Sequence, residues 1–143
     1  MARVTIAMAD IVQEGMHFLQ HRSHAPNKPA ANLIGFFGGK VEEEDNESFL
    51  EAIAREIGEE TTLEPQLSDF TRLGTFATEL VHNDKVIVIE GECFRIEVPP
   101  GVIIDSREGD IVRIPNGQLP RYVEVMSPAT VEVVTKYYDK EIE

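Results

Sequence analysis

The chain opens on two mostly apolar runs separated by a short turn signal. Residues 3–11 form the first run and residues 16–22 the second, with Glu14 and Gly15 between them. Apolar runs joined by a Gly-containing turn predict two antiparallel strands, because the turn brings the second run back beside the first. We therefore expect a β-hairpin at the start of the chain.

A third apolar run follows a polar segment. Residues 21–32 are polar and contain two prolines, which predicts a loop. Residues 33–37 are apolar and stop at Gly38-Gly39. We expect a short strand here that ends in a turn at the two glycines.

The first helical pattern begins at Ser48. Ser48 with Glu51 three residues later is the capping-box signature of a helix N-terminus. Apolar side chains then recur at helical spacing and predict one buried face, while the glutamates fall on another. The apolar positions are Leu50, Ile53, Ala54 and Ile57. The helix is expected to end at residues 63–65, where a proline follows.

Two longer strand patterns come next, at about residues 70–81 and 86–98. Residues 82–85 between them read His-Asn-Asp-Lys, a turn composition that predicts a second hairpin. Residues 111–114 predict a further strand.

The last predicted element is a helix that starts at Ser127-Pro128, with proline at the first helical position, and runs to about residue 140. Two helices among about six strands predict an α+β chain whose helices and sheet pack in layers. At 143 residues, we expect a single domain over residues 1–143.

Composition excludes several classes of function. A net charge of −13 argues against binding to a nucleic-acid backbone, which needs clustered Lys and Arg. No apolar run approaches the roughly 18 residues of a membrane helix, and the N-terminus predicts a strand rather than a signal peptide. The single cysteine, Cys93, fits a reducing compartment. We expect a cytoplasmic protein.

Three glutamates near the end of the first helix are the main candidates for chemistry. Glu56, Glu59 and Glu60 are three and four residues apart, so they are neighbours on the helix surface. Anions crowded in this way repel one another unless a cation lies among them, and oxygen ligands suit Mg²⁺ or Mn²⁺. The cluster therefore predicts metal-assisted chemistry on a phosphate-bearing substrate.

These glutamates belong to a longer pattern. Gly39, Glu47 and the run Arg55-Glu56-Ile57-Gly58-Glu59-Glu60 stand in a fixed order, with seven residues between Glu47 and the run. The pattern resembles the Nudix box, in which Gly, five residues, Glu and seven residues precede Arg-Glu-apolar-any-Glu-Glu-any-Gly-apolar. Leu63 matches the last apolar position, and Gly38-Gly39-Lys40-Val41-Glu42 is also typical of these MutT-like pyrophosphohydrolases.

The chain departs from this pattern at two places. Seven residues rather than five separate Gly39 from Glu47, so Asp45 holds the uninserted position. We keep Glu47, because Asp45 would break the spacing to the rest of the box, and we expect the acidic residues 42–45 to form a solvated loop. Thr62 replaces the glycine near the helix end, which a helix terminus tolerates at modest cost.

The resemblance implies an α/β/α sandwich around a mixed β-sheet and a pyrophosphohydrolase that cleaves a nucleoside diphosphate linked to another group. It implies metal ligation by Glu56, Glu59 and Glu60, with Mg²⁺ as the expected ion and Mn²⁺ as the alternative, and support from Glu47. Arg55 would hold the glutamates by ion pairing, since Glu59 is four residues away on the helix.

Substrate contacts and the general base are expected outside the helix. Gly38, Gly39 and Lys40 are the candidates for binding the phosphates. The resemblance does not fix the base, and we choose Glu108, with Asp110 and Glu92 as alternatives.

The substrate stays open at the level of sequence. Oxidised nucleoside triphosphates, ADP-ribose, dinucleoside polyphosphates and sugar nucleotides all fit the resemblance, which also admits a homodimer. The alternative is a Nudix-fold binding or regulatory module without catalysis. Such relatives usually lose a glutamate of the box, whereas Glu56, Glu59 and Glu60 are all present here.

Overall fold

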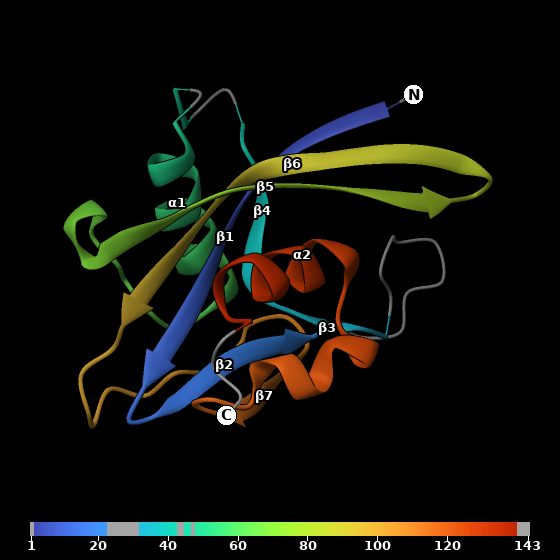
Figure 1. Ribbon diagram of the computed structural model, residues 1–143. Helices are drawn as coiled ribbons and strands as arrows, with labels where there is room; N and C mark the ends of the chain where they lie inside the picture. The colour runs from blue at the N-terminus through green and yellow to red at the C-terminus, as the bar shows by residue number, and fades with distance from the viewer. Residues whose placement is uncertain (1, 23–31, 43–44, 47, 140–143) are drawn as a thin grey trace.

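The computed structural model describes residues 2–22, 32–42, 45–46 and 48–139 (Figure 1). Within them, the strands are β1 (Ala2–Gln13), β2 (Met16–His21), β3 (Ile34–Gly35), β4 (Phe37–Lys40), β5 (Phe70–His82), β6 (Lys85–Glu97) and β7 (Asp110–Pro115). The helices are α1 (Phe49–Glu60), α2 (Pro128–Tyr137) and two short 3₁₀ turns, η2 (Leu67–Asp69) and η3 (Leu119–Val125).

β1 is the central strand of a mixed sheet. Along one edge it pairs in parallel with β6, from Ala2 to Val12. Along the other edge it pairs antiparallel with β4 at residues 6–9 and with β2 at residues 11–13. β2 continues the sheet to β3 and β7, and β5 closes the far side beyond β6. The strands β2 and β4 therefore share one edge of β1 and diverge from each other there.

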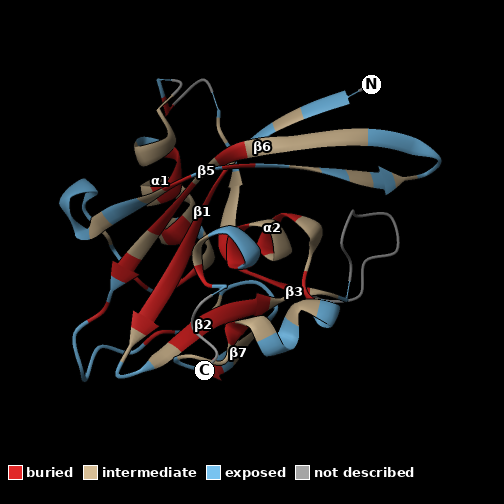
Figure 2. Ribbon diagram, viewed as in Figure 1, coloured by how far each residue is buried: buried red, intermediate tan, exposed pale blue. Residues whose placement is uncertain are grey.

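Each face of this sheet carries one helix, and Figure 2 shows buried residues along the strands and helices where the layers meet. Alternate β1 residues serve the two faces: Ala7, Ala9 and Ile11 pack in the core beneath α1, while Met8 packs in the core beneath α2. The two-residue period of a strand causes this division. The α/β/α sandwich around a mixed sheet is thus confirmed.

Both predicted hairpins are confirmed. Glu14 and Gly15 link β1 to β2, and Asn83 and Asp84 link β5 to β6. All four residues have positive φ, between 47° and 76°. Two consecutive residues of positive φ give a turn whose twist matches that of paired strands, and this is why such short links suffice.

The expected turn at the two glycines is wrong. The chain runs extended through Gly38 and Gly39 as part of β4, with Gly38 opposite Met8 of β1. A side chain at Gly38 would overlap the Ala7 carbonyl oxygen, and one at Gly39 would lie 2.6 Å from the Glu56 carboxylate. The glycines therefore allow close approach of neighbouring groups instead of reversing the chain.

Helix α1 begins as predicted and ends earlier than predicted. The Ser48 hydroxyl accepts a hydrogen bond from the Glu51 amide at 3.2 Å. The helix ends at Glu60, because Thr61 is extended and its hydroxyl donates to the Ile57 carbonyl at 2.7 Å. Its buried residues are Ala52, Ile53 and Ile57. Ile53 and Ile57 were predicted to be buried, whereas the predicted Leu50 and Ala54 are only partly buried.

Helix α2 starts at Pro128 as predicted, and η3 before it was not anticipated. None of the helices in the described ranges is long and apolar enough to cross a membrane.

Candidate functional site

Arg55 is the hub of a charged cluster on α1. Its Nη1 donates to Glu56 Oε1 at 3.0 Å and to both Glu59 carboxylate oxygens at 3.3 Å. Its Nη2 also donates to the Lys40 carbonyl oxygen at 3.0 Å, which ties the helix to the end of β4. The expected ion pair between Arg55 and Glu59 is therefore present.

Asp45 holds the Arg55 guanidinium from the loop before α1. Nε and Nη2 of Arg55 donate to its two carboxylate oxygens at 2.8 and 2.9 Å, a bidentate geometry. The hydrogen bond from Arg55 holds the pKa of Asp45 below its ordinary value. Asp45 is only 3% exposed, so the expectation of a wholly solvated acidic loop is wrong.

The local backbone explains how Asp45 reaches this position. Its carboxylate accepts from the Glu42 amide at 2.8 Å, and its carbonyl accepts from the Ser48 amide at 2.9 Å. These bonds fix Asp45, the uninserted position, against Arg55 just before the helix starts. Glu47, the residue chosen from the sequence, lies outside the described residues.

Glu56 and Glu60 point from α1 toward β4. Glu60 Oε1 accepts from the Gly38 amide at 3.0 Å, and the Glu56 carboxylate lies against Gly39. Burial, together with the nearby Glu56 charge, raises the pKa of Glu60 to about 8. Burial also raises the pKa of Glu56, against the opposing effect of Arg55.

Glu59 is the most exposed of the three glutamates and shares Arg55 Nη1 with Glu56. Its side chain is 58% exposed and is drawn toward Arg55. No group of three His, Cys, Asp or Glu side chains in the described ranges is arranged to hold a metal ion. Arg55 contacts Glu59 and Glu56, whereas the Gly38 amide contacts Glu60.

The donor chemistry nevertheless fits a hard divalent cation. Glu56 and Glu60 are two partly buried carboxylates whose pKa values burial raises, and the Glu56 charge raises that of Glu60 further. A cation beside them would favour their charged forms, and oxygen donors are what Mg²⁺ and Mn²⁺ prefer.

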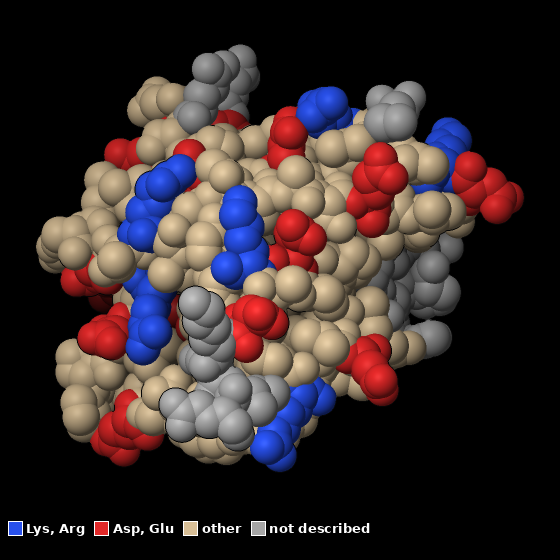
Figure 3. Space-filling model, in the orientation of Figure 1, with Lys and Arg blue, Asp and Glu red and all other residues tan. Residues whose placement is uncertain are grey.

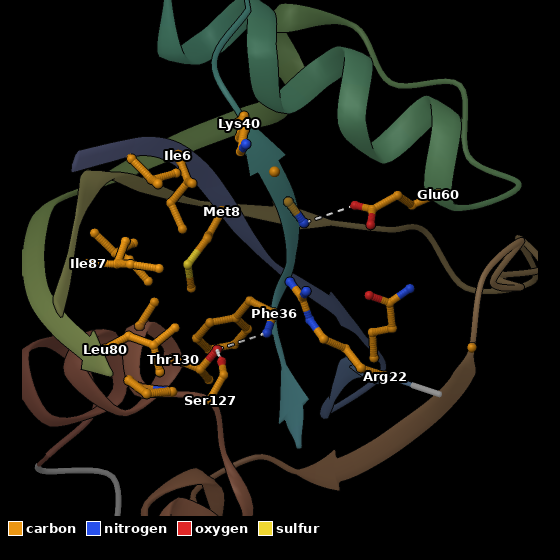
Figure 4. A pocket seen from close by; sticks show the side chains of 18 of the residues that line it. Ile6, Met8, Arg22, Phe36, Lys40, Glu60, Leu80, Ile87, Ser127 and Thr130 are labelled. Atoms are coloured by element: carbon orange, nitrogen blue, oxygen red, sulfur yellow. Dashed lines mark hydrogen bonds between the residues drawn. The ribbon is translucent and has the colours of Figure 1, made fainter. Parts of the chain in front are cut away.

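Glu60 stands at one end of a cleft with a volume of about 490 Å³ (Figure 4). The end near Glu60 is polar, and there Arg22 and Lys40 are its basic groups. The opposite wall is aliphatic and is formed by the three long strands β1, β5 and β6. Its residues are Val4, Ile6, Leu80, Ile87 and Ile89. The cleft can therefore hold an anionic group at one end and an apolar body at the other.

Some of the residues chosen from the sequence line the cleft and others do not. Gly38, Gly39, Lys40 and Glu108 all line it together with Glu60. Asp110 and Glu92, the alternative bases, are not among its lining residues. Glu92 instead pairs with Arg72 at 2.6 Å beside a smaller hollow next to the start of α1.

Sequence reasoning missed three contributors to the cleft. Gln20 and Arg22 reach it from the end of β2, and residues 127–130 reach it from the start of α2. The Thr130 hydroxyl accepts from the Phe36 amide at 3.2 Å and from the Ser127 hydroxyl at 2.9 Å, which joins α2 to the cleft floor. In the sequence, the prolines after Arg22 indicate a loop and Ser127-Pro128 indicates a helix start. Neither signal indicates that these two segments meet at one cleft.

Comparison with known proteins agrees with this arrangement. The family model of the NUDIX domain matches residues 1–113. No curated protein matches the chain.

Solved structures share the fold at low sequence identity. The MutT protein of Methanosarcina mazei Go1 is 23% identical, with a TM-score of 0.70 over 98% of this chain and 95% of that one. The NUDIX domain of Shewanella oneidensis NrtR, complexed with ADP ribose, is 17% identical, with a TM-score of 0.69 over 98% and 89%. A bifunctional NMN adenylyltransferase/ADP ribose pyrophosphatase from Francisella tularensis, complexed with AMP and a manganese ion, is 13% identical, with a TM-score of 0.65 over 97% and 42%.

The family model covers most of the chain, and the structural likeness extends over nearly all of it. The chain therefore belongs to the Nudix hydrolase family.

Proposed function

We propose that the protein is a Mg²⁺-dependent pyrophosphohydrolase that cleaves a nucleoside di- or triphosphate, or a metabolite linked to a nucleoside diphosphate. The observation that carries the proposal is the position of Glu60. It is a partly buried carboxylate of raised pKa at the polar end of a cleft whose other end is aliphatic. A perturbed acid at the end of a cleft is typical of a functional site.

Members of the family generally use divalent metal ions. Glu56, Glu59 and Glu60 are the proposed ligands, with Mg²⁺ as the ion and Mn²⁺ as a substitute. A bound cation would supply Lewis-acid stabilisation of the phosphate charge and lower the pKa of a coordinated water. Arg55 would hold the glutamates at their places on α1, and Asp45 would fix the Arg55 guanidinium through its bidentate contact.

In the proposed reaction a water oxygen bonds to phosphorus and one phosphoanhydride P–O bond breaks. Glu108, which lines the cleft with Glu60, would take the proton from the water. Arg22 and Lys40 would bind phosphate oxygens at the same end. The leaving phosphate group carries away the electron pair of the broken bond.

The aliphatic end of the cleft is the proposed place for the nucleoside. Solved neighbours complexed with ADP ribose and with AMP support a nucleotide derivative as the ligand. On the face shown in Figure 3, basic and acidic side chains are interspersed, which favours a small molecule over a nucleic-acid backbone.

The proposal is tested by a panel of nucleoside triphosphates, oxidised nucleoside triphosphates, ADP-ribose, sugar nucleotides and dinucleoside polyphosphates with millimolar Mg²⁺. We expect phosphate-containing products from at least one of them and no turnover in EDTA. Glu59→Gln should lower kcat by about 100-fold or more, the loss that follows removal of one charge-stabilising group. Glu64→Gln, an exposed glutamate just past the helix, is the matched control and should retain activity.

Two results would contradict the proposal. One is the absence of product from every compound at every metal concentration, which would favour the binding or regulatory module. The other is full turnover in the chelator, which would remove the metal from the mechanism.

A further inference from the structure

The segment at residues 103–109, between β6 and β7, is fastened to the end of α1. Thr61 and Ser106 form an isolated antiparallel bridge. On either side of it the Arg107 amide donates to the Glu60 carbonyl at 2.7 Å, and the Thr62 amide donates to the Asp105 carbonyl at 3.0 Å. The chain leaving the carboxylate helix is therefore paired directly with the chain leading to Glu108.

Thr62 adds side-chain bonds to this pairing. Its hydroxyl accepts from the Asp105 amide at 3.0 Å and donates to the Ile103 carbonyl at 3.2 Å. Thr62 occupies the position that the Nudix pattern gives to glycine. A glycine there has no hydroxyl, so the two bonds are a property of this chain rather than of the pattern.

The other end of the segment is held beside the cleft. The Glu108 carbonyl oxygen accepts from Gln20 Nε2 and from the Ser106 hydroxyl. The Glu108 amide donates back to the Ser106 hydroxyl at 3.1 Å. Gln20 is only 7% exposed and lines the cleft with Glu108, so the backbone of Glu108 is fixed from β2 as well as from its own segment.

We propose that Thr62 is a positioning residue, whose hydroxyl locks residues 103–108 to the end of α1 and thereby holds Glu108 in the cleft near Glu60. The role of Glu108 rests on the proposed function. Thr62 itself is not among the residues that line the cleft, so its effect on turnover passes through the segment it holds.

This arrangement couples the opening of residues 103–108 to kcat. Removing the hydroxyl leaves the backbone pairing in place and frees the Asp105 amide and the Ile103 carbonyl. The segment then opens more often, and Glu108 spends less time facing the reacting phosphate. Loss of orientation of this kind lowers kcat more than it raises KM, because the phosphate-binding groups are unchanged.

The test compares Thr62→Val, which keeps the shape and removes the hydroxyl, with Thr62→Ser, which keeps the hydroxyl. Thr71→Val, at an exposed threonine of β5, is the matched control. Amide hydrogen exchange of residues 103–108 is measured first, without metal or substrate. We expect exchange at the Asp105 amide to be about tenfold faster in Thr62→Val, the effect of losing one or two hydrogen bonds.

Steady-state kinetics on the best substrate of the panel is the second measurement. Thr62→Val should lower kcat by about three- to tenfold and leave KM within about twofold. Thr62→Ser should return both exchange and kcat to the wild-type level, and Thr71→Val should change neither.

Wild-type exchange or wild-type kcat in Thr62→Val overturns the proposal, as does failure of Thr62→Ser to restore them. If the wild-type protein hydrolyses no compound of the panel, the proposed function fails separately. Faster exchange in Thr62→Val with recovery in Thr62→Ser then still supports the lock, and unchanged exchange overturns it.

Discussion

Two clusters of ionisable side chains differ in how their carboxylates are satisfied. Beneath α2, Asp10 of β1 is 1% exposed. Both of its carboxylate oxygens lie 2.9 Å from His17 Nδ1, and the Tyr138 hydroxyl donates to one of them at 2.6 Å. On α1, Glu60 is only partly buried, accepts one hydrogen bond from the Gly38 amide, and lies near the like charges of Glu56 and Glu108.

The deeper carboxylate is thus the better satisfied one. A buried charge that finds several partners contributes to a unique packing arrangement and has no capacity left for a ligand. A carboxylate among like charges at the edge of a cleft retains that capacity, because burial and the like charges raise its pKa and a bound cation would offset both effects. The comparison therefore indicates a structural role for the Asp10 cluster and a binding role for the Glu60 cluster.

The largest expected effect is the pH dependence of the metal-free protein. Burial and the Glu56 charge raise the folded pKa of Glu60 to about 8 from an ordinary value of 4.5. The folded state therefore holds the proton more tightly, so this contribution to stability is complete below about pH 4.5 and is lost as the pH rises through about 8. We expect the free energy of unfolding in EDTA to fall by on the order of 3 kcal/mol between pH 5 and pH 9.

Urea unfolding at several pH values measures this change. The raised pKa of Glu56 acts in the same direction, whereas the lowered pKa of Asp45 acts only in more acidic solution. Glu60→Gln should flatten the profile, Glu64→Gln should leave it unchanged, and Mg²⁺ at pH 9 should restore stability to the wild-type protein. If stability in EDTA rises from pH 5 to pH 9, the prediction is wrong, because the charged form of Glu60 is then already stabilised by its surroundings.

The second prediction concerns the satisfied cluster. Tyr138→Phe removes the phenol donor and leaves a buried Asp10 oxygen short of a partner, which costs about 1–3 kcal/mol of folding free energy. Burial and the neighbouring Asp10 raise the pKa of Tyr138, so the phenol keeps its proton. The loss of folding free energy in Tyr138→Phe should therefore be the same at all pH values near neutrality. Turnover should stay at the wild-type level, because Asp10, His17 and Tyr138 are not among the residues that line the cleft.

Tyr137→Phe is the matched control. The Tyr137 hydroxyl donates to the Thr75 carbonyl at 2.6 Å, but at a more exposed place where water replaces the lost bond. Urea midpoints of the two variants are compared under one condition. An equal loss in both would mean that burial of Asp10 adds nothing to the cost.

The sequence predicted what depends on local pattern. Apolar runs and turn residues identified the two hairpins, and Ser48 and Pro128 marked both helix starts, because each signal acts within a few positions. The Nudix pattern likewise predicted that Arg55 pairs with Glu59 one helical turn away.

Features that depend on distant chain segments could not be predicted. Tyr138 contacts Asp10 from 128 positions away, and Gln20 meets the Glu108 backbone from 88 positions away. Asp45 was set aside because motif spacing counts residues, whereas the bonds of Asp45 to the Glu42 amide and to Arg55 depend on the folded backbone. Gly38 was read as a turn for a similar reason: the need for space beside Ala7 exists only once β1 and β4 are paired.

The smallest expected effect belongs to Glu92, a carboxylate of neither cluster. It is paired with Arg72 at 2.6 Å, and 54% of the Arg72 side chain and 22% of the Glu92 side chain are exposed. Because water and Arg72 both satisfy it, the comparison predicts neither a binding role nor a measurable contribution to stability. Glu92→Gln should leave kcat within about twofold and the urea midpoint unchanged. Glu108→Gln, measured beside it at saturating substrate, should lower kcat by about 100-fold, as expected for loss of a general base. The reverse ranking would place the base on β6, on the face of the sheet away from the cleft, and would separate the chemistry from Glu60.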